Sequence, residues 1–108
     1  MSRLALLQDM LADEPNEPFL LFAIAKEFEG TNDLTQARTY YEKLRVTNPN
    51  YVGTYYHLGK LYEKLELVEQ AIETYATGMN VAKTERDPHA LAELAGAKLN
   101  LVDEDDDF

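Results

Sequence analysis

The feature that most constrains the fold is a gapless repeat of 34 residues, in which residues 18–51 are followed by residues 52–85 with matching residue types. The matching pairs are Leu21 and Tyr55, Ile24 and Leu58, Ala25 and Gly59, Phe28 and Tyr62, Ala37 and Ala71, Tyr41 and Tyr75, and Leu44 and Gly78. A fixed period of this length is typical of solenoids built from helical hairpins. Because one hairpin alone cannot bury its apolar stripe, the period predicts an all-α solenoid of stacked antiparallel hairpins.

Turn-forming residues divide the first repeat into two helical runs. Pro18 begins the first run, and Gly30-Thr31-Asn32-Asp33 separates it from the second, for which Asp33 is a natural N-cap. The inner turn of the second repeat, residues 65–67, contains no glycine and is a weaker boundary signal. Lys83 stands where a terminating proline would recur, so we expect that helix to continue to residue 84 or 85.

The repeat continues in part beyond both of its ends. Pro15 and Pro49 stand 34 positions apart, which gives residues 3–14 the place of the second helix of a preceding repeat. Asp87-Pro88 predicts an N-cap and a first helical turn, and residues 87–101 match the start of the second repeat at a spacing of 33. We therefore expect about six helices in one domain over residues 1–102, closed by this capping helix, and a disordered acidic tail over residues 103–108.

Composition excludes several classes of function. Twenty acidic residues against ten basic ones give a net charge of -10, which disfavours binding to nucleic acid or to an anionic membrane surface. A solvated acidic surface or a salt-loving source organism would account for the bias. No run of residues suits a signal peptide or a membrane span, so we expect a cytoplasmic protein.

Residues for catalysis or for metal binding do not form a recognisable constellation. The chain has no cysteine, and its two histidines, His57 and His89, lack a metal-ligand spacing. There is no glycine-rich phosphate loop and no nucleophile elbow. We predict no enzymatic activity, no catalytic residue, no metal and no cofactor.

The repeated residues resemble a known family pattern. Its large, small and aromatic positions are carried in the second repeat by Tyr55, Leu58-Gly59, Tyr62, Ala71, Tyr75 and Gly78. This pattern resembles the tetratricopeptide repeat, in a small protein of bacterial type. The chain departs from the family pattern in lacking its tryptophan and, at Lys83, its second proline.

The resemblance implies a module that binds a peptide or a partner helix in a concave groove formed by the first helices of the repeats. The groove positions that it implies are Phe19, Phe22, Lys26, Glu29, Tyr56, His57, Lys60, Glu63 and Lys64. Aromatic side chains beside two lysines suit an acidic peptide with a bulky apolar residue. Alternatively, Lys26 pairs with Glu29, and Lys60 pairs with Glu63 or with Glu93 of the capping helix. The groove lacks the side chains with which the family's chaperone clamp holds a terminal carboxylate.

Other functions stay open at this stage. The protein could be a structural, self-associating one, a weak homodimer rather than a monomer, with contacts through exposed apolar residues of the end helices such as Leu4, Leu11, Leu94 and Leu101. It could also be the regulatory subunit of an enzyme complex. A third hypothesis places the acidic end of the chain, residues 105–108, in the lysine-bearing groove.

Overall fold

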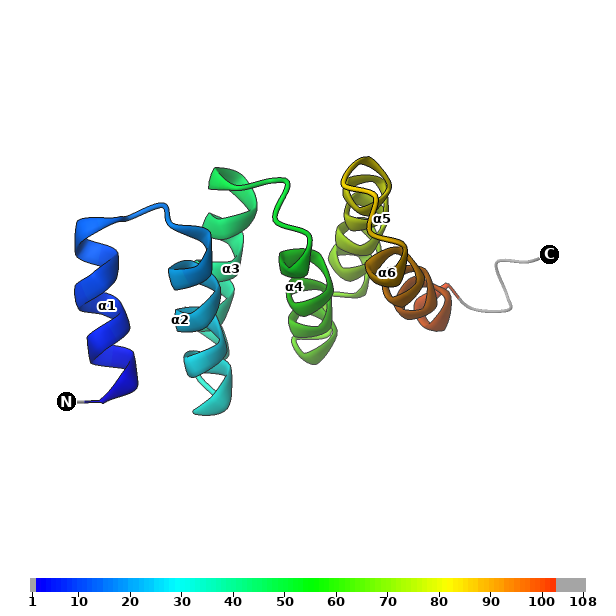
Figure 1. Cartoon of the computed structure of the whole chain (residues 1–108). Helices are drawn as coiled ribbons and strands as arrows, with labels where there is room; N and C mark the ends of the chain where they lie inside the picture. Colours follow the sequence, from blue (N-terminus) through cyan, green and yellow to red (C-terminus); the bar gives the residue numbers. More distant parts are fainter. Residues whose placement is uncertain (1, 103–108) are drawn as a thin grey trace. The chain divides into compact units, whose positions relative to one another are not determined.

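The computed structural model describes residues 2–102, and within them the chain forms six α-helices and no strand (Figure 1). The helices are α1 (Arg3–Asp13), α2 (Pro18–Gly30), α3 (Leu34–Thr47), α4 (Gly53–Lys64), α5 (Val68–Thr84) and α6 (Pro88–Leu101). The predicted all-α fold with six helices is confirmed, as is the extension of the fifth helix to residue 84. The predicted tail, residues 103–108, lies outside the described residues.

Two compact units divide the helices between them. The first unit holds α1, α2 and α3 and ends at Tyr51, and the second begins at Val52 and holds α4, α5 and α6. The division falls where the first 34-residue repeat ends in the sequence.

In the first unit, α2 and α3 form a helical hairpin, and α1 packs on α2. One apolar stripe of α1 supplies the contact, because Leu4, Leu7 and Leu11 recur at helical spacing. Leu7 is buried with Ile24 of α2, and Leu4 and Leu11 lie partly buried against the same cluster. The opposite face of α1 is not covered in this way.

In the second unit, α4 and α5 form the hairpin, and α6 packs on both. A Cβ atom added at Gly59 would lie 2.2 Å from the ring of Tyr75, so the absence of a side chain there permits the close approach of α4 and α5. Gly78 of α5 approaches Tyr55 and Leu94 in the same manner. Leu94 is 1% exposed, which makes the expectation that it offers an exposed apolar contact wrong, since α6 turns this residue inward.

The turns between α2 and α3, between α4 and α5, and between α5 and α6 share one geometry. Each has a residue with a positive φ, namely Asn32 (61°), Glu66 (61°) and Arg86 (57°). In each turn, the N–H of this residue and the N–H of the next residue donate to carbonyl groups of the preceding helix. The donor and acceptor pairs are Asn32 to Glu29, Asp33 to Phe28, Glu66 to Glu63, Leu67 to Tyr62, Arg86 to Lys83 and Asp87 to Ala82. These bonds define a Schellman motif, which explains how the turn at residues 65–67 forms without glycine.

Side chains cap four of the six helix N-termini. The predicted caps Asp33 and Asp87 are confirmed, since each carboxylate accepts a hydrogen bond from the backbone N–H three residues later. Ser2 and Glu17 cap α1 and α2 in the same way. The helices α4 and α5 begin without a side-chain cap, and their stability therefore depends more on packing within the hairpin.

Candidate functional site

The first helix of each hairpin carries the same three-residue arrangement. On α2, Lys26 Nζ lies 3.7 Å from Glu29 Oε1, and Tyr41 Oη of α3 donates a 2.5 Å hydrogen bond to the same carboxylate oxygen. On α4, Lys60 Nζ lies 3.7 Å from Glu63 Oε2, which accepts a hydrogen bond from Tyr75 of α5. Each glutamate therefore joins a lysine of the exposed helix surface to a tyrosine of the hairpin core.

The two tyrosines are neutral members of this arrangement. Burial raises the pKa of Tyr41 well above its ordinary value, and the hydrogen bond and negative charge of Glu29 raise it further. Burial, Glu63 and, to a smaller extent, Tyr56 raise the pKa of Tyr75 in the same direction. Because neither hydroxyl ionises near neutral pH, both keep the proton that they donate to the glutamate.

Both lysines of this arrangement pair with a glutamate on their own helix. Lys26 pairs with Glu29 and Lys60 with Glu63, as one of the two alternatives expects. Glu93, the other partner considered for Lys60, lies 3.8 Å from His89 instead. At 3.7 Å both lysine pairs are longer than a hydrogen bond, so each pair is a loose contact between a partly exposed lysine and a more buried glutamate.

Aromatic side chains surround the predicted positions of the first unit. Phe19, in the first turn of α2, is 57% exposed. Phe22 packs edge-on against Tyr41 at 6.1 Å between ring centroids, and its ring also lies 5.9 Å from that of Tyr51. Tyr51 was not among the predicted site residues, and the repeat gives no signal for it because the matching position in the second repeat is Glu85.

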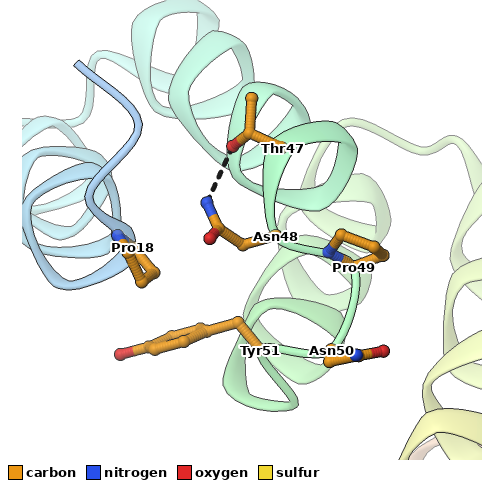
Figure 2. Close-up of a pocket in the computed structure, with 6 residues that line it drawn as sticks. All are labelled: Pro18, Thr47, Asn48, Pro49, Asn50 and Tyr51. Atoms are coloured by element: carbon orange, nitrogen blue, oxygen red, sulfur yellow. Dashed lines mark hydrogen bonds between the residues drawn. The ribbon is translucent and has the colours of Figure 1, made fainter.

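Tyr51 also lines a cleft of about 390 Å³ in the first unit. Its lining residues are Pro18, Thr47, Asn48, Pro49, Asn50 and Tyr51. Figure 2 shows the ring of Tyr51 reaching toward Pro18, while Asn48 donates to the Thr47 hydroxyl. The Asn48 side chain also donates to the carbonyl group of Asn16, which ties the loop after α3 to the loop before α2.

The second unit has a cleft of about 360 Å³ along α4 and α6. Its lining residues are Val52, Gly53, Tyr56, His57, Asp87, His89, Ala90, Glu93 and Leu94. Tyr56 and His57 are predicted groove positions, and their rings lie edge to face with 5.6 Å between the centroids. Lys60 Nζ lies 5.5 Å from the centroid of the Tyr56 ring, within the range of a cation–π contact.

The predicted groove positions do not include the α6 side of this cleft. Asp87, His89 and Glu93 line it, although the family pattern places groove contacts on the first helices of full repeats only. The spacing of 33 that relates residues 87–101 to the second repeat is the signal that could have found them. Across residues 2–102, no group of three or more His, Cys, Asp and Glu side chains is placed to hold a metal ion.

The predicted positions form two sets, each within its own unit. Phe19, Phe22, Lys26 and Glu29 lie along α2, and Tyr56, His57, Lys60, Glu63 and Lys64 lie along α4. Glu29 and Glu63 are engaged by core tyrosines, so their carboxylates stabilise the hairpins in addition to facing the helix surface. Within the described part of the chain, no helix has the length and apolarity required to cross a bilayer.

Comparison with known proteins shows which family this architecture belongs to. The family model of the tetratricopeptide repeat matches residues 52–84. A tetratricopeptide repeat domain protein from Salinibacter ruber, solved in solution, is 45% identical, with a TM-score of 0.78, over 82% of this chain and 89% of its own. The chain belongs to the tetratricopeptide repeat family. A crystal structure of a tetratricopeptide repeat domain protein from the same organism is 46% identical over 79% of this chain and 96% of its own, with a TM-score of 0.76.

A more distant structure supports the fold of this tetratricopeptide repeat protein. A protein from Bordetella parapertussis is 21% identical over 97% of this chain and 91% of its own, with a TM-score of 0.80. No curated protein sequence is a significant match. Tetratricopeptide repeats generally mediate protein–protein interactions, and the fold is typically a non-enzymatic interaction module.

Proposed function

We propose that this tetratricopeptide repeat protein binds a segment of a partner protein along the exposed faces of α2 and α4, the first helices of the repeats at residues 18–51 and 52–85. The segment carries acidic side chains and a bulky apolar residue. The observation that carries the proposal is the recurrence, on both helices, of a lysine whose neighbouring glutamate is held by a core tyrosine.

The held glutamates favour binding of an acidic group by the lysines. Because Tyr41 and Tyr75 fix the carboxylates, each lysine lies beside an acceptor at 3.7 Å without a close hydrogen bond. A ligand carboxylate that approaches to hydrogen-bonding distance gains a shorter contact than the one already present. Each repeat therefore offers one lysine that suits an acidic residue of the ligand.

Apolar and aromatic surface lies beside each lysine. In the first unit, Phe19 is exposed about two helical turns before Lys26 on the same helix. In the second unit, the ring of Tyr56 lies under Lys60 and lines the 360 Å³ cleft. Rigid aromatic side chains of this kind are frequent anchors of protein interfaces, since they bury a large area at little cost in conformational entropy.

Selection from a displayed library of random peptides tests the proposal. We expect the purified chain to enrich peptides in which Asp or Glu accompanies Leu, Phe or another bulky apolar residue, with binding that weakens as salt increases. The Lys26→Ala, Lys60→Ala double variant should lose this enrichment. Phe19→Ala, at an exposed side chain, should weaken binding without affecting the fold.

The matched control is Lys43→Ala with Lys83→Ala, which removes two exposed lysines from the second helices α3 and α5. It changes the net charge by the same amount and should leave the selected peptides bound. Enrichment of basic peptides, or equal binding of the selected peptides by both double variants, would overturn the proposal.

A further inference from the structure

The end helices α1 and α6 occupy complementary places in the repeat pattern. By sequence, α1 matches α3, the second helix of a hairpin, at a spacing of 34, and α6 matches α4, a first helix, at a spacing of 33. In both complete hairpins a first helix packs on a second helix, α2 on α3 and α4 on α5. Among residues 2–102, no first helix precedes α1 and no second helix follows α6.

On α1, apolar residues are exposed at positions that the complete hairpin covers. Leu6 and Met10 correspond to Tyr40 and Leu44 of α3. Leu44 is fully buried, and Tyr40 stacks on Phe28 of α2 at 5.7 Å. Leu6 and Met10 are instead 52% and 47% exposed. Two large apolar side chains one turn apart thus form an uncovered stripe on α1.

On α6, small residues are exposed at positions that receive an aromatic ring in the complete hairpin. Ala92 and Gly96 correspond to Gly59 and Glu63, two residues of α4 that adjoin Tyr75. A Cβ added at Gly96 would meet nothing within 4 Å, whereas one at Gly59 would overlap the Tyr75 ring. Both Ala92 and Gly96 are exposed, and Leu99, one turn further, is 69% exposed.

The two faces fit each other in size. Ala92 and Gly96 of α6 carry little or no side chain beside the exposed Leu99, and Leu6 and Met10 of α1 carry large side chains that can pack against such small residues. Leu7, the counterpart of Tyr41, is occupied in the contact of α1 with α2, so Leu6 and Met10 supply the remaining apolar surface. A large-into-small arrangement of this kind joins α4 to α5 at Gly59.

The charges at the helix ends are also complementary in the antiparallel orientation of a hairpin. This orientation brings the start of α1 to the end of α6, with the positive end of the helix dipole and with Arg3, which also pairs with Glu27 of α2 at 3.1 Å. The sequence continues from α6 into the acidic run of residues 103–107. At the other end, Asp13 and the following residue Glu14 come to the N-terminus of α6, which is the positive end of its helix dipole.

We propose that α1 of one copy packs antiparallel on α6 of a second copy, so that the two end helices complete a hairpin between molecules. The contact joins two different surfaces, and each copy therefore keeps one uncovered face after pairing. Association should be head to tail, and the number of copies in an assembly should increase with protein concentration unless the assembly closes into a ring. This interface is separate from the α2 and α4 faces of the proposed function.

Measurement of molar mass by light scattering and sedimentation, from micromolar to millimolar protein, tests the interface. The 108-residue chain should increase in mass with concentration, less so at high salt because the helix-end charges are then screened. Leu6→Glu removes the α1 face and Leu99→Glu removes the α6 face. Since both side chains are exposed, each variant should remain folded by circular dichroism and should be monomeric alone.

A mixture of the two variants distinguishes head-to-tail association from a symmetric dimer. Each variant keeps the face that the other lacks, so an equimolar mixture should form a one-to-one heterodimer and stop there. The control Val46→Glu, at an exposed position of α3, adds the same charge and should associate as the unaltered chain does. A monomeric unaltered chain at millimolar concentration, a mixture that stays monomeric, or a single variant that still dimerises would overturn the proposal.

Discussion

Adding one methyl group at each of two helical glycines should stabilise the chain at one of them and fail to do so at the other. Gly59 of α4 and Gly96 of α6 both lie inside helices of the second unit, so Gly59→Ala and Gly96→Ala share the same backbone benefit. Alanine in place of glycine favours a helix by about 1 kcal/mol, since it restricts the unfolded chain. The two variants differ in what surrounds the new methyl group.

At Gly59 the new Cβ would lie 2.2 Å from Cε1 and 2.7 Å from Cδ1 of Tyr75. The ring is fully buried and its hydroxyl is bonded to Glu63, so it cannot move aside without loosening that bond. Overpacking of this kind costs about 1 to 3 kcal/mol. Ala25 holds the matching position in α2, so a hairpin of this type accepts a methyl group there when the facing aromatic ring lies further away. We therefore expect about 1 to 2 kcal/mol of overpacking cost.

At Gly96 no atom lies within 4 Å of the added Cβ, so the backbone benefit should remain in full. Gly96→Ala should stabilise the second unit by up to about 1 kcal/mol, and Gly59→Ala should be less stable than Gly96→Ala by about 1 to 2 kcal/mol. For a chain of this size, that difference corresponds to roughly 4 to 16 °C in Tm.

Urea unfolding followed by circular dichroism at low protein concentration measures both free energies, and comparing the two variants cancels the shared helix term. Both glycines lie in the second unit, so both variants report on the same unfolding transition even if the two units unfold separately. Equal stabilisation by both substitutions would refute the reasoning, since it would mean that the Tyr75 ring does not contact α4 at Gly59. An unchanged pKa of Tyr75 in Gly59→Ala would count against displacement of the ring.

Two further predictions concern the turns and the tyrosines. Glu66→Gly and Arg86→Gly should each raise the free energy of unfolding by about 0.5 to 1 kcal/mol, because glycine adopts the positive φ without strain. A loss of stability for both variants in urea titrations would contradict this account of the turns. The folded chain holds the protons of Tyr41 and Tyr75 more tightly than the unfolded chain, whose tyrosines ionise near pH 10. The stability that these two tyrosines contribute should therefore be fully present below about pH 10 and should fall as the pH rises above it. Tyr41→Phe and Tyr75→Phe should each lower the free energy of unfolding by about 1.5 kcal/mol at neutral pH and should make the loss of stability above about pH 10 less steep. If the double variant lost stability as steeply as the unaltered chain, groups other than these tyrosines would cause the loss.

The helices and their caps could be predicted from the sequence because their signals are local. Asp33 and Asp87 precede apolar helical runs, and a carboxylate there meets the free N–H groups of the first turn whatever the rest of the chain does. Glycine is the usual residue at the end of a helix, yet Glu66 adopts the same conformation. The Schellman hydrogen bonds and the packing of the α4–α5 hairpin outweigh the strain at this position.

The candidate site was less predictable because its contacts depend on distance in space. The sequence placed Glu29 and Glu63 on the helix surface, but nothing local shows that Tyr41 and Tyr75, twelve residues further on, donate to them. Tyr51 has no aromatic counterpart in the second repeat, so the periodic pattern could not single it out as a neighbour of Phe22. The inward position of Leu94 depends on how α6 is rotated against Gly78, which apolar spacing alone does not determine.

The Lys–Glu–Tyr arrangement also bears on how such a protein can evolve. Glu29 and Glu63 serve the fold and the surface together, so a substitution that changes the charge offered to a partner would also remove the acceptor of a buried tyrosine. The neighbouring positions Lys26 and Lys60 are tied only by loose contacts at 3.7 Å. Selection for a new partner can therefore act on the lysines at little cost to stability, while the glutamates stay under constraint from the hairpin. The preference for a ligand can diverge between descendants of this chain without any change in the scaffold that presents it.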